Sequence, residues 1–118
     1  MKSITCVVVP VGARPYSKEI STSNEAIQEL VGGYYEIIRL SSRLLLLCDE
    51  EAKLKGSAGN RRIGREIIAG QFIIVGDGGK DFVSLDKYEV AAMIGRFSTP
   101  EEISPEETED SCQIIVVE

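Results

Sequence analysis

Residues 43–50 read RLLLLCDE, and this short apolar run is the strongest indication of the fold class. Four leucines and a cysteine in succession give a strand that is apolar on both faces, which is typical of a central strand in a sheet. The run is far shorter than the ~20 apolar residues that a membrane-spanning helix needs. We therefore expect residues 44–48 to lie in the middle of a sheet.

Short aliphatic or β-branched runs on both sides of this strand predict its neighbours. YYEIIRL (34–40) comes before it and is expected to form a hairpin with it around the two serines at 41–42. After it, the turn DGGKD (77–81) joins a strand at FIIV (72–75) to FVSL (82–85). SITCVVV (3–9) predicts a further strand, and YSKEI (16–20) another extended piece.

Two segments show the periodicity of helices. In STSNEAIQELVGG (21–33), a capping box of Thr22 and Glu25, with a stop at Gly32–Gly33, predicts a helix over about 23–31. In LDKYEVAAMIGRF (85–97), Asp86 is the candidate N-cap of a helix whose face carries Val90, Met93, Ile94 and Phe97. The expected fold class is α+β, a mixed, mostly antiparallel sheet of four to six strands with two helices packed on one face.

The charges divide the chain into a neutral body and an acidic tail. Residues 1–97 contain thirteen basic and twelve acidic side chains, whereas residues 98–118 contain seven acidic side chains and no basic one. A length of 118 residues suits a single domain. We expect an α+β domain over 1–97, an acidic linker over 98–111, and a C-terminal edge strand or partner-binding segment over 112–118.

The chain has no histidine and only three cysteines. Without histidine it lacks the commonest general base and the partner of most nucleophilic serines and cysteines. Cys6, Cys48 and Cys112 lie in aliphatic stretches without metal-ligand spacing, so buried free thiols are expected. We predict a protein that is not an enzyme and that needs no cofactor or metal. The apolar stretch Cys6–Val9 is too short for an export signal, which predicts a cytoplasmic location.

Residues 53–65, KLKGSAGNRRIGR, concentrate five basic side chains among glycines and contain no acid. The spacing of Gly59 and Gly64 imitates a phosphate-binding loop. However, Arg65 and Glu66 stand where that loop needs a lysine and a hydroxyl residue, so a nucleotide triphosphatase is not predicted.

A simpler anion site remains, because arginine forks suit phosphate or carboxylate and glycines let backbone N–H groups approach a ligand. The candidate ligand-binding residues are Lys55, Gly59, Asn60, Arg61, Arg62, Gly64 and Arg65. A competing interpretation is a solvated loop whose bases balance Asp49–Glu51 and the acidic tail, or a loop that the tail itself occupies as a pseudo-ligand. Nucleic-acid binding is not expected, because the acidic tail repels phosphates.

The order of several blocks resembles a known family. LVGGYYEII, LLLLCDEEAKLKG, NRRIG, IIAGQFIIVG and DFVSL, followed by a helix, are similar in that order to a family of small bacterial, phage and mobile-element proteins described as a domain of unknown function. The resemblance covers about residues 4–97. It implies no activity, but it implies an accessory protein that acts on host systems, in the host cytoplasm if a phage encodes it.

Two hypotheses of function follow. The first is a non-catalytic binding protein of phage or mobile-element origin that holds an anionic ligand, such as a nucleotide signal, or an acidic patch of a host protein. The basic Gly/Arg loop would bind it and so counteract a host system. The alternative is a protein–protein interaction module that acts through the acidic tail and C-terminal strand, as an inhibitor or DNA mimic. Both allow a homo-oligomer, and neither involves a membrane.

Overall fold

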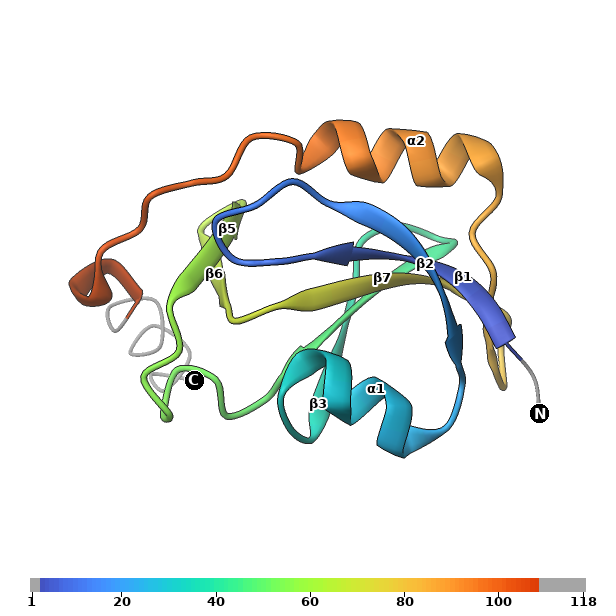
Figure 1. Cartoon of the computed structure of the whole chain (residues 1–118), viewed down its shortest axis with the longest axis horizontal. Coiled ribbons are helices and arrows are strands. Elements are labelled where there is room, and N and C mark those ends of the chain that lie inside the picture. The colour runs from blue at the N-terminus through green and yellow to red at the C-terminus, as the bar shows by residue number, and fades with distance from the viewer. Residues whose placement is uncertain (1–2, 109–118) are drawn as a thin grey trace.

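A computed structural model describes residues 3–108 and contains a six-stranded antiparallel sheet, a separate two-stranded hairpin and two helices of at least two turns (Figure 1). The sheet has the order β2-β1-β7-β4-β3, and β8 pairs with β7. This architecture confirms the α+β class and the mostly antiparallel sheet. The elements are β1 (Ser3–Val9), β2 (Tyr16–Ser21), α1 (Asn24–Val31), β3 (Tyr35–Arg39), β4 (Leu44–Asp49), β5 (Gly59–Ile63), β6 (Glu66–Ala69), β7 (Phe72–Asp77), β8 (Phe82–Val83) and α2 (Lys87–Arg96).

The apolar run at residues 44–48 lies in β4, and β4 is central as expected. It pairs with β3 on one side and β7 on the other, so that Leu46 lies between Ile38 and Ile74. Its side chains alternate between two cores. Leu45 and Leu47 face one cluster of buried side chains, and Leu46 faces the other.

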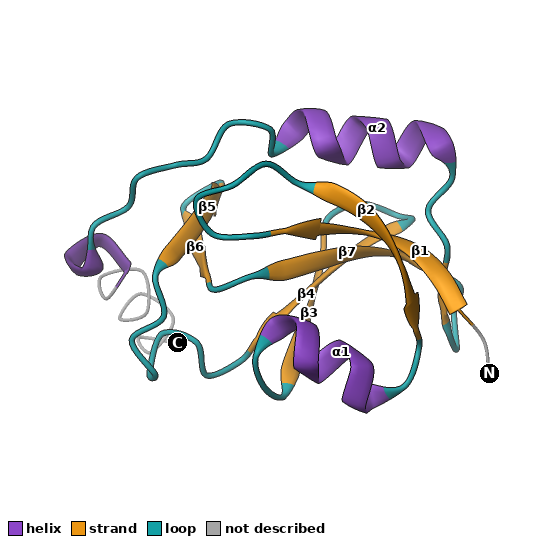
Figure 2. Ribbon diagram, in the orientation of Figure 1, coloured by secondary structure: helices purple, strands orange, loops and turns teal. Residues whose placement is uncertain are grey.

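The two helices cover opposite faces of the sheet, as Figures 1 and 2 show. Ile27 and Val31 of α1 pack into the core on one face, and Met93 of α2 packs into the core on the other. The expectation that both helices share one face is therefore wrong. The physical reason lies in β4 and β7, which are apolar on both faces and so need a cover on each.

The ends of the helices follow local sequence rules. Asp86 caps α2 in a capping box with Glu89, as predicted for its N-cap. In α1 the cap is Ser23, whose hydroxyl accepts a hydrogen bond from the backbone N–H of Ala26, so the expected capping box of Thr22 is wrong by one residue. Gly32 ends α1 in the left-handed region, with φ of 98°.

The expected basic loop contains a strand. Residues 59–63 form β5, which pairs with β6 across a two-residue turn of Gly64 and Arg65. Gly64 has φ of 61°, which a turn with glycine at its first position requires. The hairpin is held in place because Ile68 joins the core beneath α2, together with Phe97.

Residues 98–108 run from the end of α2 past β5 and finish in one helical turn at 105–108 (Figure 1). Thr108, the last described residue, is buried. The remainder of the predicted linker, the predicted C-terminal strand at 112–118 and Cys112 lie outside the described residues. Among residues 3–108 no helix is long and apolar enough to cross a membrane.

Candidate functional site

Arg61 lies inside the protein, with only 1% of its surface exposed. Its guanidinium donates to the carbonyl oxygen of Phe97 from both Nε (3.2 Å) and Nη2 (2.8 Å), and Nη2 also donates to the carbonyl of Ala13 (2.8 Å). A cation at this place is favourable because the C-terminal end of α2 presents unpaired carbonyls and a partial negative charge. Arg61 therefore joins β5 to the end of α2 and to the β1–β2 connection.

Asn60 completes this internal network. Its amide donates to the carbonyls of Val9 (2.8 Å) and Gly70 (2.9 Å), and its Oδ1 accepts from Nη1 of Arg61 at 2.6 Å. Asn60 is the extra residue of a β-bulge, since Gly59 and Arg61 face consecutive residues of β6. Because of the bulge, the side chains of Asn60 and Arg61 both point inward. In a regular strand they would alternate, and one of them would be exposed.

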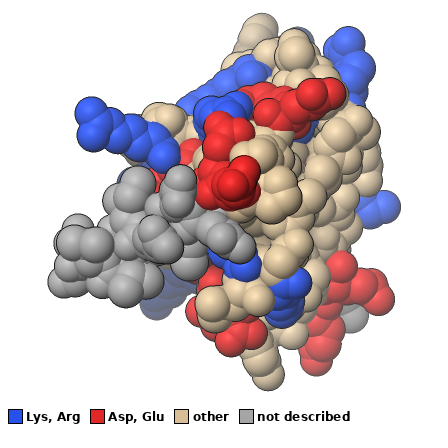
Figure 3. Space-filling view, turned by 90° about the vertical axis from the view of Figure 1, so that its left-hand side faces the viewer, with Lys and Arg blue, Asp and Glu red and all other residues tan. Residues whose placement is uncertain are grey.

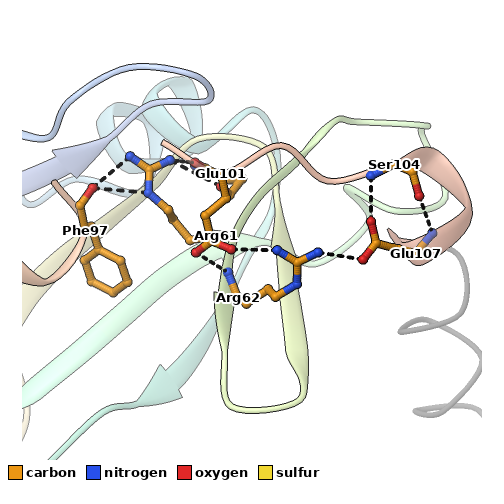
Figure 4. A network of polar contacts seen from close by, with 7 residues as sticks. Arg61, Arg62, Phe97, Glu101, Ser104 and Glu107 are labelled. Atoms are coloured by element: carbon orange, nitrogen blue, oxygen red, sulfur yellow. Dashed lines mark hydrogen bonds and ion pairs between the residues drawn. The ribbon is translucent and has the colours of Figure 1, made fainter. Parts of the chain in front are cut away.

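Arg62 points outward and binds two carboxylates of residues 98–108 (Figure 4). Its guanidinium donates to Glu101 at 2.8 Å and to Glu107 at 2.6 Å. Its backbone N–H donates to the second carboxylate oxygen of Glu101 at 3.1 Å. The backbone and side chain of Arg62 thus converge on one carboxylate, which is a geometry that suits an anion.

The tail segment, defined here as residues 98–108, is held against β5 by more than these ion pairs. Ser104 and Glu107 form a reciprocal capping box, with both hydrogen bonds at 3.1 Å. The bond from the Ser104 N–H, with the neighbouring Arg62, lowers the pKa of Glu107. A methyl group on Gly59 would lie 2.8 Å from Ile103, so the segment needs glycine there. Residues 98–108, which form most of the predicted linker, therefore dock on the body.

The remaining predicted ligand-binding residues lie elsewhere. Lys55 donates to Asp49 at 2.8 Å and to the carbonyl of Gly32 at 3.0 Å, near the end of α1. Gly64 and Arg65 form the exposed tip of the β5–β6 hairpin. The seven residues therefore do not converge. Figure 3 shows acidic and basic side chains intermixed on this end of the molecule, where the sequence suggested one basic patch.

A hollow beside the central strands was not predicted. It lies between β3–β4 and β6, has a volume of about 280 Å³, and is called the acidic groove below. The apolar part of its lining consists of Ile38, Cys48, Ala52 and Ile68. The charged part includes the carboxylates of Glu36, Glu50 and Glu66. Each of these glutamates belongs to or borders a strand, but the sequence does not show that the three strands meet. The lining of the acidic groove does not include Arg61, Arg62 or Arg65.

Two cysteines lie in the described residues, and both are buried free thiols as predicted. Burial raises the pKa of Cys6 to about 11 and that of Cys48 to about 12. Both thiols therefore stay protonated and poorly nucleophilic at neutral pH. Within residues 3–108 no three side chains of histidine, cysteine, aspartate or glutamate come together as metal ligands.

Comparison with known families adds one match. Residues 2–98 match the family described as "Domain of unknown function (DUF3846)". The chain belongs to this family. The match ends two residues after α2, so the family covers the α+β body that includes β5 and the Arg61 network. No curated protein and no solved structure matches the chain.

Proposed function

We propose that the protein is a non-catalytic binding protein whose anion site is the outer face of β5, centred on Arg62. The observation that carries the proposal is the double contact of Arg62 with Glu101, through the guanidinium and the backbone N–H. A carboxylate held in this way occupies the position that a phosphate or an acidic side chain of a partner would take. The tail segment is then an internal competitor for that site.

Fewer residues are available at this anion site than the sequence predicted. Arg61 and Asn60 serve the interior and are not available to a ligand. Arg62 remains, and Arg65 lies three residues further on, at the exposed tip of the hairpin. A nucleotide signal or an acidic patch of a host protein has the right charge, and the resemblance to phage and mobile-element proteins favours such a target.

Calorimetry with inorganic phosphate, AMP and the acidic peptide STPEEISPEET, which repeats residues 98–108, tests this proposal. The full chain carrying Glu101→Gln and Glu107→Gln should bind at least one probe about fivefold more tightly than the unmodified chain, because Arg62 loses its internal partners. Adding Arg62→Ala to the double variant should abolish the gain.

The matched control is Glu102→Gln with Glu106→Gln. It removes two negative charges from the same segment, at exposed positions that do not contact Arg62. If this control tightens binding as much as the first pair does, general repulsion explains the effect and the Arg62 site is refuted. No heat with any probe, in any variant, would also refute it.

The alternative, a protein–protein module acting through the acidic tail, remains a second proposal. It is favoured by the exposure of Glu102 and Glu106, which leaves two carboxylates of the docked segment facing solvent. The same two variants separate the proposals. The variant with Glu102→Gln and Glu106→Gln should no longer bind a basic partner, whereas its anion binding at Arg62 should be unaffected.

A further inference from the structure

The acidic groove combines an apolar interior with an excess of negative charge. Glu36 extends from β3, Glu66 from β6, and Glu50 follows the end of β4. Lys53 is the nearby cation, and it lies 3.8 Å from Glu66. The fourth acid at the groove, Asp49, is already neutralised by Lys55 at 2.8 Å. In the part of the chain that the structure describes, Glu36 and Glu50 therefore form no ion pair.

Burial and the neighbouring carboxylates both disfavour the ionised form of Glu36. Burial raises the pKa of Glu36, and the charges of Glu50 and Glu66 raise it further, against the opposing effect of Lys53. The cost of ionising Glu36 would fall if a cation entered the groove, because an opposite charge at short range favours the ionised carboxylate. Charge complementarity thus indicates a positively charged occupant.

The apolar surface indicates that the occupant is more than a simple ion. Ile38 and Ile68 line the groove together with Leu54, and Leu54 is 80% exposed at its border. Leu54 thus extends the apolar side of the groove, on which an apolar side chain of a partner can pack. A volume of about 280 Å³ admits one or two side chains rather than a bulky ligand.

We propose that the acidic groove is a docking site for a segment of a partner protein in which a lysine or arginine stands next to an apolar residue. The basic group would lie between Glu36 and Glu50, and the apolar side chain would pack on Leu54 and Ile38. This site is separate from the Arg62 site and has the opposite charge. The chain's own residues 109–118 carry three acids and no base, so they are a poorer match in charge.

Peptide titrations followed by two-dimensional NMR of the full chain test the proposal. The probes are Ac-Leu-Lys-Leu-Lys-amide, Ac-Leu-Glu-Leu-Glu-amide and Ac-Ser-Lys-Ser-Lys-amide. We expect the first alone to shift the amide signals of Glu36, Leu54 and Ile68 in a saturable manner. Binding should weaken as salt rises from about 50 to 300 mM, because these ion pairs are open to solvent. Absence of saturable shifts at the groove with the first peptide would overturn the proposal.

Variants of the full chain locate the binding. Glu36→Gln with Glu50→Gln should weaken the first peptide about fivefold, as expected for two exposed ion pairs. Glu25→Gln with Glu29→Gln removes the same charge from the exposed side of α1, outside the groove lining, and should leave the affinity unchanged. Equal weakening by both pairs would show non-specific attraction and overturn the proposal.

Sedimentation of the unmodified chain distinguishes two other occupants. One result would be a dimer that dissociates on Glu36→Gln with Glu50→Gln, together with no binding of the peptides. A second copy would then fill the groove. The other result would be a monomer in which Ile114→Asp shifts the amide signals of the groove residues, again without binding of the peptides. The chain's own C-terminal residues would then fill the groove. Either result refutes the partner-protein proposal.

Discussion

Arg61 donates two hydrogen bonds to the carbonyl oxygen of Phe97, and this pair of contacts attaches the β5–β6 hairpin to the end of α2. Replacing Arg61 with methionine keeps much of the volume but leaves the buried acceptors of Phe97 and Asn60, and the half-buried carbonyl of Ala13, without this donor. Each buried acceptor that loses its partner costs ~1–3 kcal/mol. We expect Arg61→Met to lower the free energy of unfolding by about 3 kcal/mol, measured by urea denaturation followed by circular dichroism.

Arg65→Met is the matched control, because Arg65 is exposed at the tip of the same hairpin. An exposed substitution of this kind should change the free energy of unfolding by about 0.5 kcal/mol or less. If the two variants were equally stable, the internal network would contribute nothing and Arg61 would behave as a surface residue.

Gly59→Ala tests the docking of the tail segment. The added methyl group would lie 2.8 Å from Ile103 and 2.9 Å from the hydroxyl of Thr108, so the segment must move away. We expect hydrogen exchange at the Thr108 N–H, which donates to the Ser104 carbonyl, to become about tenfold faster in the variant. The amides of β4 should keep their protection.

Gly95→Ala provides the control for that substitution, because no atom lies within 4 Å of the methyl group that it adds to α2. Alanine is a better helix former, so a small gain of about 0.5 kcal/mol is expected, without any change at Thr108. Unaltered exchange at Thr108 in Gly59→Ala would show that the segment does not rest on β5.

Acid should destabilise the protein partly through Glu89. Arg43, at 2.7 Å, and the N–H of Asp86 lower the pKa of Glu89 below its usual value of 4.5. A carboxyl with a lowered pKa in the folded state stabilises the protein above its unfolded pKa, and this contribution is lost as the pH falls through the folded pKa. Glu89→Gln should therefore reduce the fall in stability between about pH 5 and pH 3, measured by denaturation at each pH.

Glu102→Gln serves as the comparison for Glu89→Gln, because Glu102 is exposed and stands outside the contacts of the helix. Its stability should fall with pH as steeply as that of the unmodified chain. A profile for Glu89→Gln that matched the unmodified chain would mean that the contact with Arg43 does not persist in solution.

The two buried thiols should resist alkylation. With pKa values of about 11 and 12, Cys6 and Cys48 are almost entirely protonated at pH 8, and both are shielded by the core. Iodoacetamide should therefore label neither in the native protein but both in urea, as mapped by mass spectrometry of peptides. Native labelling of either residue at the rate of a free thiol would contradict the burial.

The sequence predicted best what depends on near neighbours. β4 could be predicted because five apolar residues in succession suit a strand that is buried on both faces. The N-cap at Asp86 could be predicted because a cap and its partner are three residues apart. The placement of the helices was predicted wrongly, since the pattern of a helix does not state which face of a sheet it covers.

The candidate site was predicted less well, for a different physical reason. The carbonyls that hold Arg61 come from residues 36 and 48 positions away in the chain, and such partners leave no local pattern. The bulge at Asn60 added to the error, because it turns two consecutive polar side chains inward. One competing interpretation of the charges places the acidic tail on the basic loop, and the structure contains such a contact at Arg62.

The position of Phe97 has a consequence for how the molecule unfolds. Its carbonyl is the acceptor for Arg61 and its ring packs edge-on against Phe72 of β7 at 5.4 Å between centroids, so one residue links hairpin, helix and sheet. These three parts should consequently melt in a single cooperative transition. The tail segment rests on β5 of this unit, so exchanging residues 98–108 should lower the temperature of that one transition without dividing it.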